Sequence, residues 1–180
     1  PATNRAKDIA AARRMYFAST APTMWNLSWW ADPIVFGRYP EDGVKAHAAA
    51  MPRIRSGDMA LIAQPVDYLA HNCYNGYPVR AGAKGVPEKV PGGWGAGNPR
   101  GTLPWLEISA DALYWAARFQ TERYPLPLVF TENGLCNTDF VHLDGAVHDP
   151  QRIDFLRRYL GGMQRAVAEA YEEIAIIASD

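Results

Sequence analysis

Apolar residues recur every three or four positions near the end of the chain, starting just after Asp149-Pro150. That spacing places them on one face of an α-helix. Asp149 can cap the first turn with its side chain, and a proline is well tolerated at the first helical position. Gly161 and Gly162 weaken this helix by roughly 1 kcal/mol each. The expected apolar face carries Ile153, Leu156, Leu160, Met163, Val167, Tyr171 and Ile174, and residues 174–177 allow a further strand.

Similar patterns divide the rest of the chain into short elements. Proline and glycine punctuate segment 25–40, so we expect it to be a loop. Segment 82–101 holds seven Gly and three Pro and is expected to be a long surface loop. Elsewhere the sequence predicts helices over residues 5–18, 41–51, 56–64 and 110–123, the last capped by Ser109, and strands over residues 66–72 and 126–131.

Strands that alternate with helices in this way predict an α/β fold with a parallel sheet. The 180 residues are 48% hydrophobic and 21% charged, which is an ordinary globular composition. The formal net charge is −1, so we expect neither nucleic acid nor a membrane surface as a partner. No apolar run approaches the roughly 20 residues that span a membrane, and we expect a cytoplasmic protein.

The sequence indicates neither a metal nor a cofactor. His47, His142 and His148 do not have the spacing of metal ligands. No glycine-rich nucleotide motif is present. Cys73 and Cys136 form no zinc pattern, and free thiols are favoured over a disulfide, although their pairing stays open at this point.

The best candidate for chemistry lies at the end of the second predicted strand. Apolar residues lead directly into Thr131-Glu132-Asn133-Gly134. In parallel α/β folds, side chains at the carboxyl ends of the strands face the ligand. We therefore take Glu132 as a candidate catalytic carboxylate. The alternative is that Glu132 caps a turn that Asn133-Gly134 merely forms.

This motif resembles the nucleophile motif of the family-1 glycoside hydrolases, in which a hydrophobic strand ends in Thr-Glu-Asn-Gly. Segments 64–74, 105–108 and 144–156 also resemble that family, in the same order along the chain. The resemblance implies a retaining β-glycosidase of the β-glucosidase type. It also implies that residues 1–180 are the C-terminal portion of a (β/α)8 TIM barrel, incomplete in this chain.

The resemblance further implies roles for four residues. Glu132 would be the nucleophile that forms a covalent glycosyl-enzyme, and Tyr74 would hydrogen-bond it and steer its ionisation. Asn72 would support the sugar site, and Trp105 would line the leaving-group side of the cleft. Cys73 stands where the family usually has an aromatic residue. His71 is expected to be a buried core histidine rather than a ligand of the substrate.

The chain lacks the family's acid/base motif, Thr-x-Asn-Glu-Pro, and the Trp-Ser of its last strand. We therefore expect the remaining barrel half to lie in another chain or to be missing, so that this chain alone is inactive. The expected substrate is a β-glucoside or another small carbohydrate. Two alternatives stay open: a non-catalytic sugar-binding or structural fragment, and an enzyme acting on 6-phospho-β-glucosides or thioglucosides.

Overall fold

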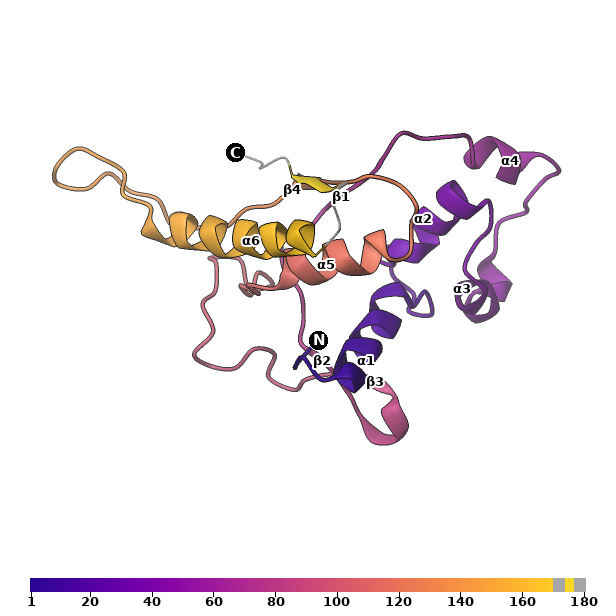
Figure 1. The fold of residues 1–180 in the computed structure, drawn as a ribbon, viewed down its shortest axis with the longest axis horizontal. Helices are drawn as coiled ribbons and strands as arrows, with labels where there is room; N and C mark the ends of the chain where they lie inside the picture. Colours follow the sequence, from indigo (N-terminus) through magenta and orange to yellow (C-terminus); the bar gives the residue numbers. More distant parts are fainter. Residues whose placement is uncertain (170–173, 177–180) are drawn as a thin grey trace. The chain divides into compact units, whose positions relative to one another are not determined.

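The computed structural model describes residues 1–169 and 174–176. The chain divides into two compact units (Figure 1). Unit 1 comprises Pro1–Asp67 and Val79–Lys89, and unit 2 comprises Tyr68–Pro78 and Val90–Asp180.

Unit 1 consists of a cluster of helices and a two-stranded hairpin. The hairpin lies beside the first helix (Figure 1), where the Asp8 carboxylate accepts a hydrogen bond of 2.9 Å from the Ala81 amide. A second hydrogen bond to Asp8, from Thr3, helps to lower the pKa of its carboxyl group. The elements are α1 (Ala6–Phe17), α2 (Leu27–Phe36), α3 (Glu41–Ala46), η1 (Ala48–Ala50), α4 (Asp58–Ile62), β2 (Val79–Ala81), η2 (Ala83–Gly85) and β3 (Pro87–Lys89).

Unit 2 contains the parallel sheet that the sequence predicted. The strand order is β1-β4-β5, and both pairings are parallel. Each connection passes through a helix, so the unit consists of consecutive strand–helix–strand steps. Its elements are β1 (Leu69–Asn72), α5 (Ala112–Thr121), β4 (Leu128–Glu132), α6 (Pro150–Ala168) and β5 (Ile174–Ile176).

β4 lies in the middle of this sheet, between β1 and β5. Leu128 and Phe130 are fully buried on one face, and α5 packs close to the strand. Helices α5 and α6 lie side by side (Figure 1), with their apolar faces against each other. This arrangement fixes the carboxyl end of β4, where the sequence places its polar motif.

The expectation that segment 25–40 is a loop is wrong, because α2 occupies most of it. Pro33 lies inside this helix, three residues before its end, and Gly37 then stops it with a positive φ of 67°. Proline removes one hydrogen bond from a helix. Burial of Ala31 and the packing of the Trp29 ring on Tyr39 help to offset that loss.

Two other expectations need correction. Ser109 does not cap α5, whose N-cap is Asp111; the Ser109 hydroxyl instead accepts a hydrogen bond from the Gly76 amide. Segment 82–101 is not loop throughout, since η2 and β3 lie within it. The content of glycine and proline in a segment does not reveal a three-residue strand such as β3, which forms by pairing with β2.

The buried face of α6 also differs from the expected one. Ile153 and Leu160 are 57% and 42% exposed, and only Met163 of the expected residues in the described part of the helix is fully buried. Tyr171 lies outside the described residues, and of Ile174 only the backbone is described. The observed face consists of Phe155, Tyr159, Gly162, Met163 and Ala166.

Within the described residues, no helix combines the length and the apolar character that crossing a membrane requires.

Candidate functional site

The candidate site lies where β1 and β4 end side by side. The two strands are parallel, and Asn72 pairs with Glu132, the last residue of each strand. The register shifts between His71 and Asn72, and the Cys73 amide then donates a hydrogen bond of 2.9 Å to the Glu132 carbonyl. The carboxyl ends of both strands therefore deliver polar side chains to one edge of the sheet, as the sequence predicted.

The Glu132 carboxylate contacts Tyr74 directly. The Tyr74 hydroxyl donates a hydrogen bond to Glu132 Oε2, across 58 residues of sequence. Both side chains are partly exposed, so the carboxylate is neither in the core nor fully in solvent. This hydrogen bond orients the carboxylate through one of its two oxygens.

Asn72 and Trp105 flank this pair. The Thr131 hydroxyl donates a hydrogen bond of 2.9 Å to Asn72 Oδ1. The Trp105 ring stands edge-on to the Tyr74 ring, with centroids 6.2 Å apart, and is 50% exposed. An exposed indole beside a carboxylate offers a flat apolar surface of the kind on which sugar rings stack. The structure thus brings Trp105, Tyr74 and Glu132 into one chain of contacts, with Asn72 next to it in the ladder.

Asn133 holds the backbone next to the site. The sequence did not predict this role, because Asn133 was expected only to form a turn. Its side chain is fully buried, and Nδ2 donates a hydrogen bond of 2.8 Å to the Cys73 carbonyl. This bond connects the residue after Glu132 with the residue after Asn72. Its place directly after Glu132, at the end of an apolar run, was the one local signal, and it does not indicate that the Cys73 carbonyl is the partner.

His71 and Cys73 are packed residues rather than reactive ones. The Gln120 amide lies 3.0 Å from His71 Nε2, and the Phe130 ring packs against the imidazole. Burial lowers the pKa of His71 to about 4, so the imidazole is neutral at pH 7 and accepts from Gln120. Burial raises the pKa of Cys73 to about 12, and a thiol that stays protonated is a poor nucleophile. Cys73 and Cys136 are both free.

The segment after Glu132 is held by an arginine on α6. Arg152 Nε donates a hydrogen bond of 2.9 Å to the Leu135 carbonyl, and the guanidinium also binds both oxygens of Asp139 at 2.8 and 2.9 Å. This fork lowers the pKa of Asp139. Asp149, the N-cap of α6, accepts from the same guanidinium. The chain that leaves β4 is therefore fixed to the start of α6.

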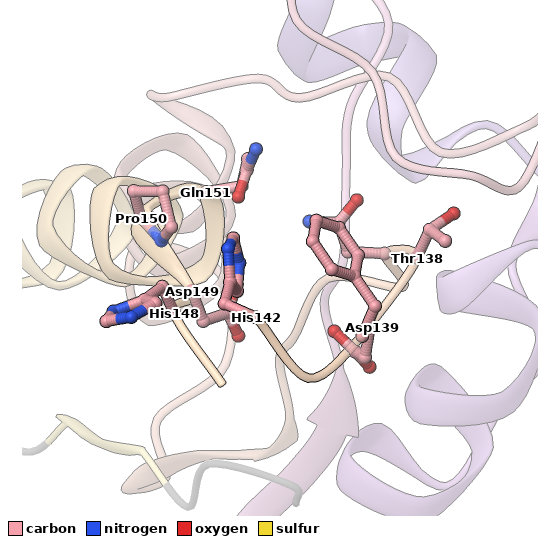
Figure 2. A pocket seen from close by; sticks show the side chains of 9 residues that line it. Thr138, Asp139, His142, His148, Asp149, Pro150 and Gln151 are labelled. Atoms are coloured by element: carbon pink, nitrogen blue, oxygen red, sulfur yellow. The ribbon is translucent and has the colours of Figure 1, made fainter. Parts of the chain in front are cut away.

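A hollow of about 310 Å³ is lined by the segment that connects β4 to α6 and by the first residues of that helix. Figure 2 shows Thr138 and Asp139 on one side of it and His142 and Gln151 on the other. None of the four predicted site residues lines it. Among the side chains that the structure describes, no group of three His, Cys, Asp or Glu is arranged to hold a metal ion.

Comparisons with known proteins agree with one another. A family model described as Glycosyl hydrolase family 1 matches residues 1–178. Beta-glucosidase A of Thermotoga maritima is 32% identical over 170 residues, which cover 94% of this chain and 36% of that protein. The bifunctional beta-D-glucosidase/beta-D-fucosidase of Bifidobacterium breve is 34% identical over 156 residues, covering 77% of this chain and 34% of that protein.

Solved structures give the same result. The beta-glucosidase from Thermotoga maritima in complex with castanospermine superposes with a TM-score of 0.74 at 28% identity, over 97% of this chain and 38% of that one. A structure described as the family 1 b-glucosidase from Thermotoga maritima also gives a TM-score of 0.74 at 28% identity, over 99% of this chain and 38% of that one. The chain therefore spans little more than a third of the length of the relatives that it matches.

Proposed function

The chain belongs to glycosyl hydrolase family 1, and from that membership we propose that it supplies the nucleophile of a retaining β-glycosidase, with Glu132 as that group. The observation that carries the proposal is the Glu132 carboxylate at the end of β4, held by the hydroxyl of Tyr74. The relatives named β-glucosidase support a β-glucoside as the substrate.

In the proposed reaction, a Glu132 oxygen forms a bond to the anomeric carbon while the bond from that carbon to the leaving oxygen breaks. The leaving oxygen takes its electron pair and receives a proton from a second carboxyl group. That group then removes a proton from water, and the water oxygen displaces Glu132 to give the free sugar. The covalent glycosyl-enzyme on Glu132 makes the overall reaction retaining.

We propose that the second carboxyl group comes from the rest of a (β/α)8 barrel, because none of the 180 residues forms the Thr-x-Asn-Glu-Pro motif. The two carboxyl groups of a retaining enzyme lie roughly 5–5.5 Å apart. At that distance their negative charges would repel by ~3 kcal/mol at an effective dielectric of about 20. This repulsion favours one protonated and one ionised group, which is the division of labour that the reaction needs.

The neighbouring residues receive roles from their positions. We propose that Tyr74 orients the Glu132 carboxylate, since its hydroxyl already donates to one carboxylate oxygen. Trp105 would stack against the leaving group, because half of its surface is exposed beside Tyr74. Asn72 would hydrogen-bond the sugar through its amide group, since Thr131 donates to its Oδ1 and leaves Nδ2 to donate.

The proposal is tested with Glu132→Ala in the assembled enzyme, meaning this chain together with the rest of its barrel. Loss of the nucleophile should lower kcat on an aryl β-glucoside by ~10⁴-fold or more. Azide, which can attack the anomeric carbon from the vacated position, should restore part of the rate and yield a glycosyl azide. Glu88→Ala, on the exposed hairpin of unit 1, is the control and should keep the wild-type rate. A wild-type rate for Glu132→Ala would remove this residue from the mechanism.

A second candidate function is a sugar-binding or structural fragment without catalysis. The observation behind it is that these 180 residues contain no Thr-x-Asn-Glu-Pro motif. It predicts that the chain binds a β-glucoside, while the assembled enzyme shows no turnover that depends on Glu132. The Glu132→Ala experiment therefore separates the two functions.

A further inference from the structure

Tyr159 lies in the middle of α6 and is completely buried. Its hydroxyl makes two hydrogen bonds to backbone groups outside the helix. It donates to the Tyr74 carbonyl at 2.9 Å and accepts from the Ser109 amide at 2.9 Å. The Tyr159 ring stacks on Phe155, with centroids 4.0 Å apart and planes 25° from parallel. The hydroxyl is thus held rigidly at a point between two segments that carry site residues.

These two segments are joined at further points. The Gly76 amide donates a hydrogen bond of 2.7 Å to the Ser109 hydroxyl. The Asn75 side chain donates a hydrogen bond of 2.8 Å to the Trp105 carbonyl. Hydrogen bonds therefore connect residues 74–76 with residues 105–109, and Tyr159 binds both segments to α6.

The position of the Tyr74 hydroxyl follows from its backbone, because only two side-chain torsions separate the ring from the main chain. Holding the Tyr74 carbonyl therefore restricts where its hydroxyl can reach. Burial raises the pKa of Tyr159, so its hydroxyl keeps its proton and acts as the donor to that carbonyl. The other end of Tyr74 donates to Glu132.

We propose that Tyr159 is a positioning residue that acts through Tyr74, setting the hydrogen bond by which Tyr74 orients the Glu132 carboxylate. This inference rests on the proposed role of Glu132 as nucleophile. Tyr159 itself does not touch the sugar. Its hydroxyl holds the backbone of Tyr74, a loop residue, so that the Tyr74 side chain can bind the Glu132 carboxylate on β4.

The test compares two tyrosines at the contact between α5 and α6. Tyr159→Phe removes the hydroxyl and keeps the ring on Phe155. Tyr114→Phe is the matched control, because Tyr114 is also buried, and its hydroxyl bonds Glu169 at 2.7 Å and Arg118 at 3.1 Å instead of the Tyr74 segment. Both variants lose hydrogen bonds in similar surroundings, so a general loss of stability should affect them alike.

The first readout needs no catalysis and uses the assembled enzyme, with the tyrosine rings of this chain labelled with ¹³C. In NMR spectra, Tyr159→Phe should shift the Tyr74 ring resonances and weaken the cross-peaks between the Tyr74 and Trp105 rings. Tyr114→Phe should leave both unchanged. Unchanged Tyr74 signals in Tyr159→Phe would overturn the inference.

The second readout is the rate at which a dinitrophenyl 2-deoxy-2-fluoro-β-glucoside labels the assembled enzyme. Its leaving group departs as a phenolate without a proton donor, so the rate reports attack by Glu132 alone. Tyr159→Phe should slow this labelling about 10-fold with little change in the affinity for the reagent, because a small misplacement of a reacting group has effects of this order.

Combining two substitutions shows whether Tyr159 acts through Tyr74. If it does, Tyr74→Phe/Tyr159→Phe should label no more slowly than Tyr74→Phe alone. Effects that multiply would instead assign Tyr159 an independent role and overturn the inference. An enzyme that labels at no residue would contradict the proposed function, and the NMR comparison would still decide whether Tyr159 positions Tyr74.

Discussion

Single residues at the ends of β1 and β4 determine what this chain can do chemically. Glu132 lies at the end of a buried strand, Tyr74 reaches it from a loop, and Trp105 contacts the Tyr74 ring from another loop. Asn133 joins the two strand ends beneath them. The carboxylate is therefore held in one orientation by this chain alone, and the proposed attack on an anomeric carbon would benefit from that orientation.

His71, directly before the shift in strand register, gives the site a dependence of stability on pH. Burial lowers its pKa from 6.5 to about 4, so the folded state holds fewer protons than the unfolded state between those values. The free energy of unfolding should therefore fall as the pH drops from 6.5 towards 4. The maximum loss from this residue is ~3 kcal/mol.

Urea unfolding at several pH values between 4 and 7.5 checks this expectation. Lowered carboxyl pKa values, such as that of Asp139, act mainly at still lower pH. His71→Gln removes the imidazole and should flatten the dependence between pH 4.5 and 6.5. Equal slopes for the wild type and His71→Gln would show that the imidazole is not the group responsible.

Which residues could be predicted depended on how local their signal was. The position of Glu132 followed from a short apolar run that ends in a polar motif, and the structure has this run as the central strand of the sheet. The support from Tyr159 and Asn133 could not be predicted, because both act through backbone carbonyls that are distant in sequence. Sequence spacing carries no information on which carbonyl a buried donor will meet.

At the scale of elements, the packing of α5 against α6 sets the position of the site. Periodicity correctly predicted a helix from Pro150, with Asp149 as its side-chain cap. It did not predict which side of that helix meets α5, since spacing fixes the width of an apolar stripe and not its partner. The helix buries Phe155 and Tyr159 instead of Ile153 and Leu160. Gly162 lies on the buried face, and its lack of a side chain lets α6 approach the backbone at Ala110.

The adjacent pair Gly161 and Gly162 gives a matched test of that approach. A methyl group at Gly161 would meet nothing within 4 Å, whereas one at Gly162 would lie 3.3 Å from the Ala110 carbonyl oxygen. Alanine is favoured over glycine inside a helix by roughly 1 kcal/mol. Gly161→Ala should therefore raise the free energy of unfolding by about that amount.

Gly162→Ala should lose this gain, because the carbonyl belongs to the backbone and α6 would have to move away from α5. We expect this variant to be at least ~1 kcal/mol less stable than Gly161→Ala in urea unfolding. Equal stability of the two variants would contradict the close approach of the helices.

At the scale of the whole molecule, the chain matches only part of the architecture of its relatives. Its sheet runs β1-β4-β5, and within the described residues β1 has β4 as its only neighbour. The family members that it matches are about two and a half times as long. The parallel α/β class was predictable from alternating strands and helices, while the division into two compact units was not. That division depends on contacts between segments 1–67 and 79–89, which no local pattern encodes.

The chain alone should not hydrolyse an aryl β-glucoside, because the proposed acid/base group lies outside it. Adding the rest of the barrel should produce turnover that Glu132→Ala abolishes. Assays of the chain with and without that complement check this expectation. Clear turnover by the 180-residue chain alone would mean that one of its own residues acts as the acid/base.

The central claim is that Glu132 attacks the anomeric carbon, and covalent trapping tests it most directly. The assembled enzyme is incubated with a dinitrophenyl 2-deoxy-2-fluoro-β-glucoside and digested, and the labelled peptide is sequenced by mass spectrometry. We predict one fluoroglucosyl group, bound to Glu132 in the peptide that contains Thr131-Glu132-Asn133-Gly134. A label on any other carboxylate, with Glu132 unmodified, would contradict the account.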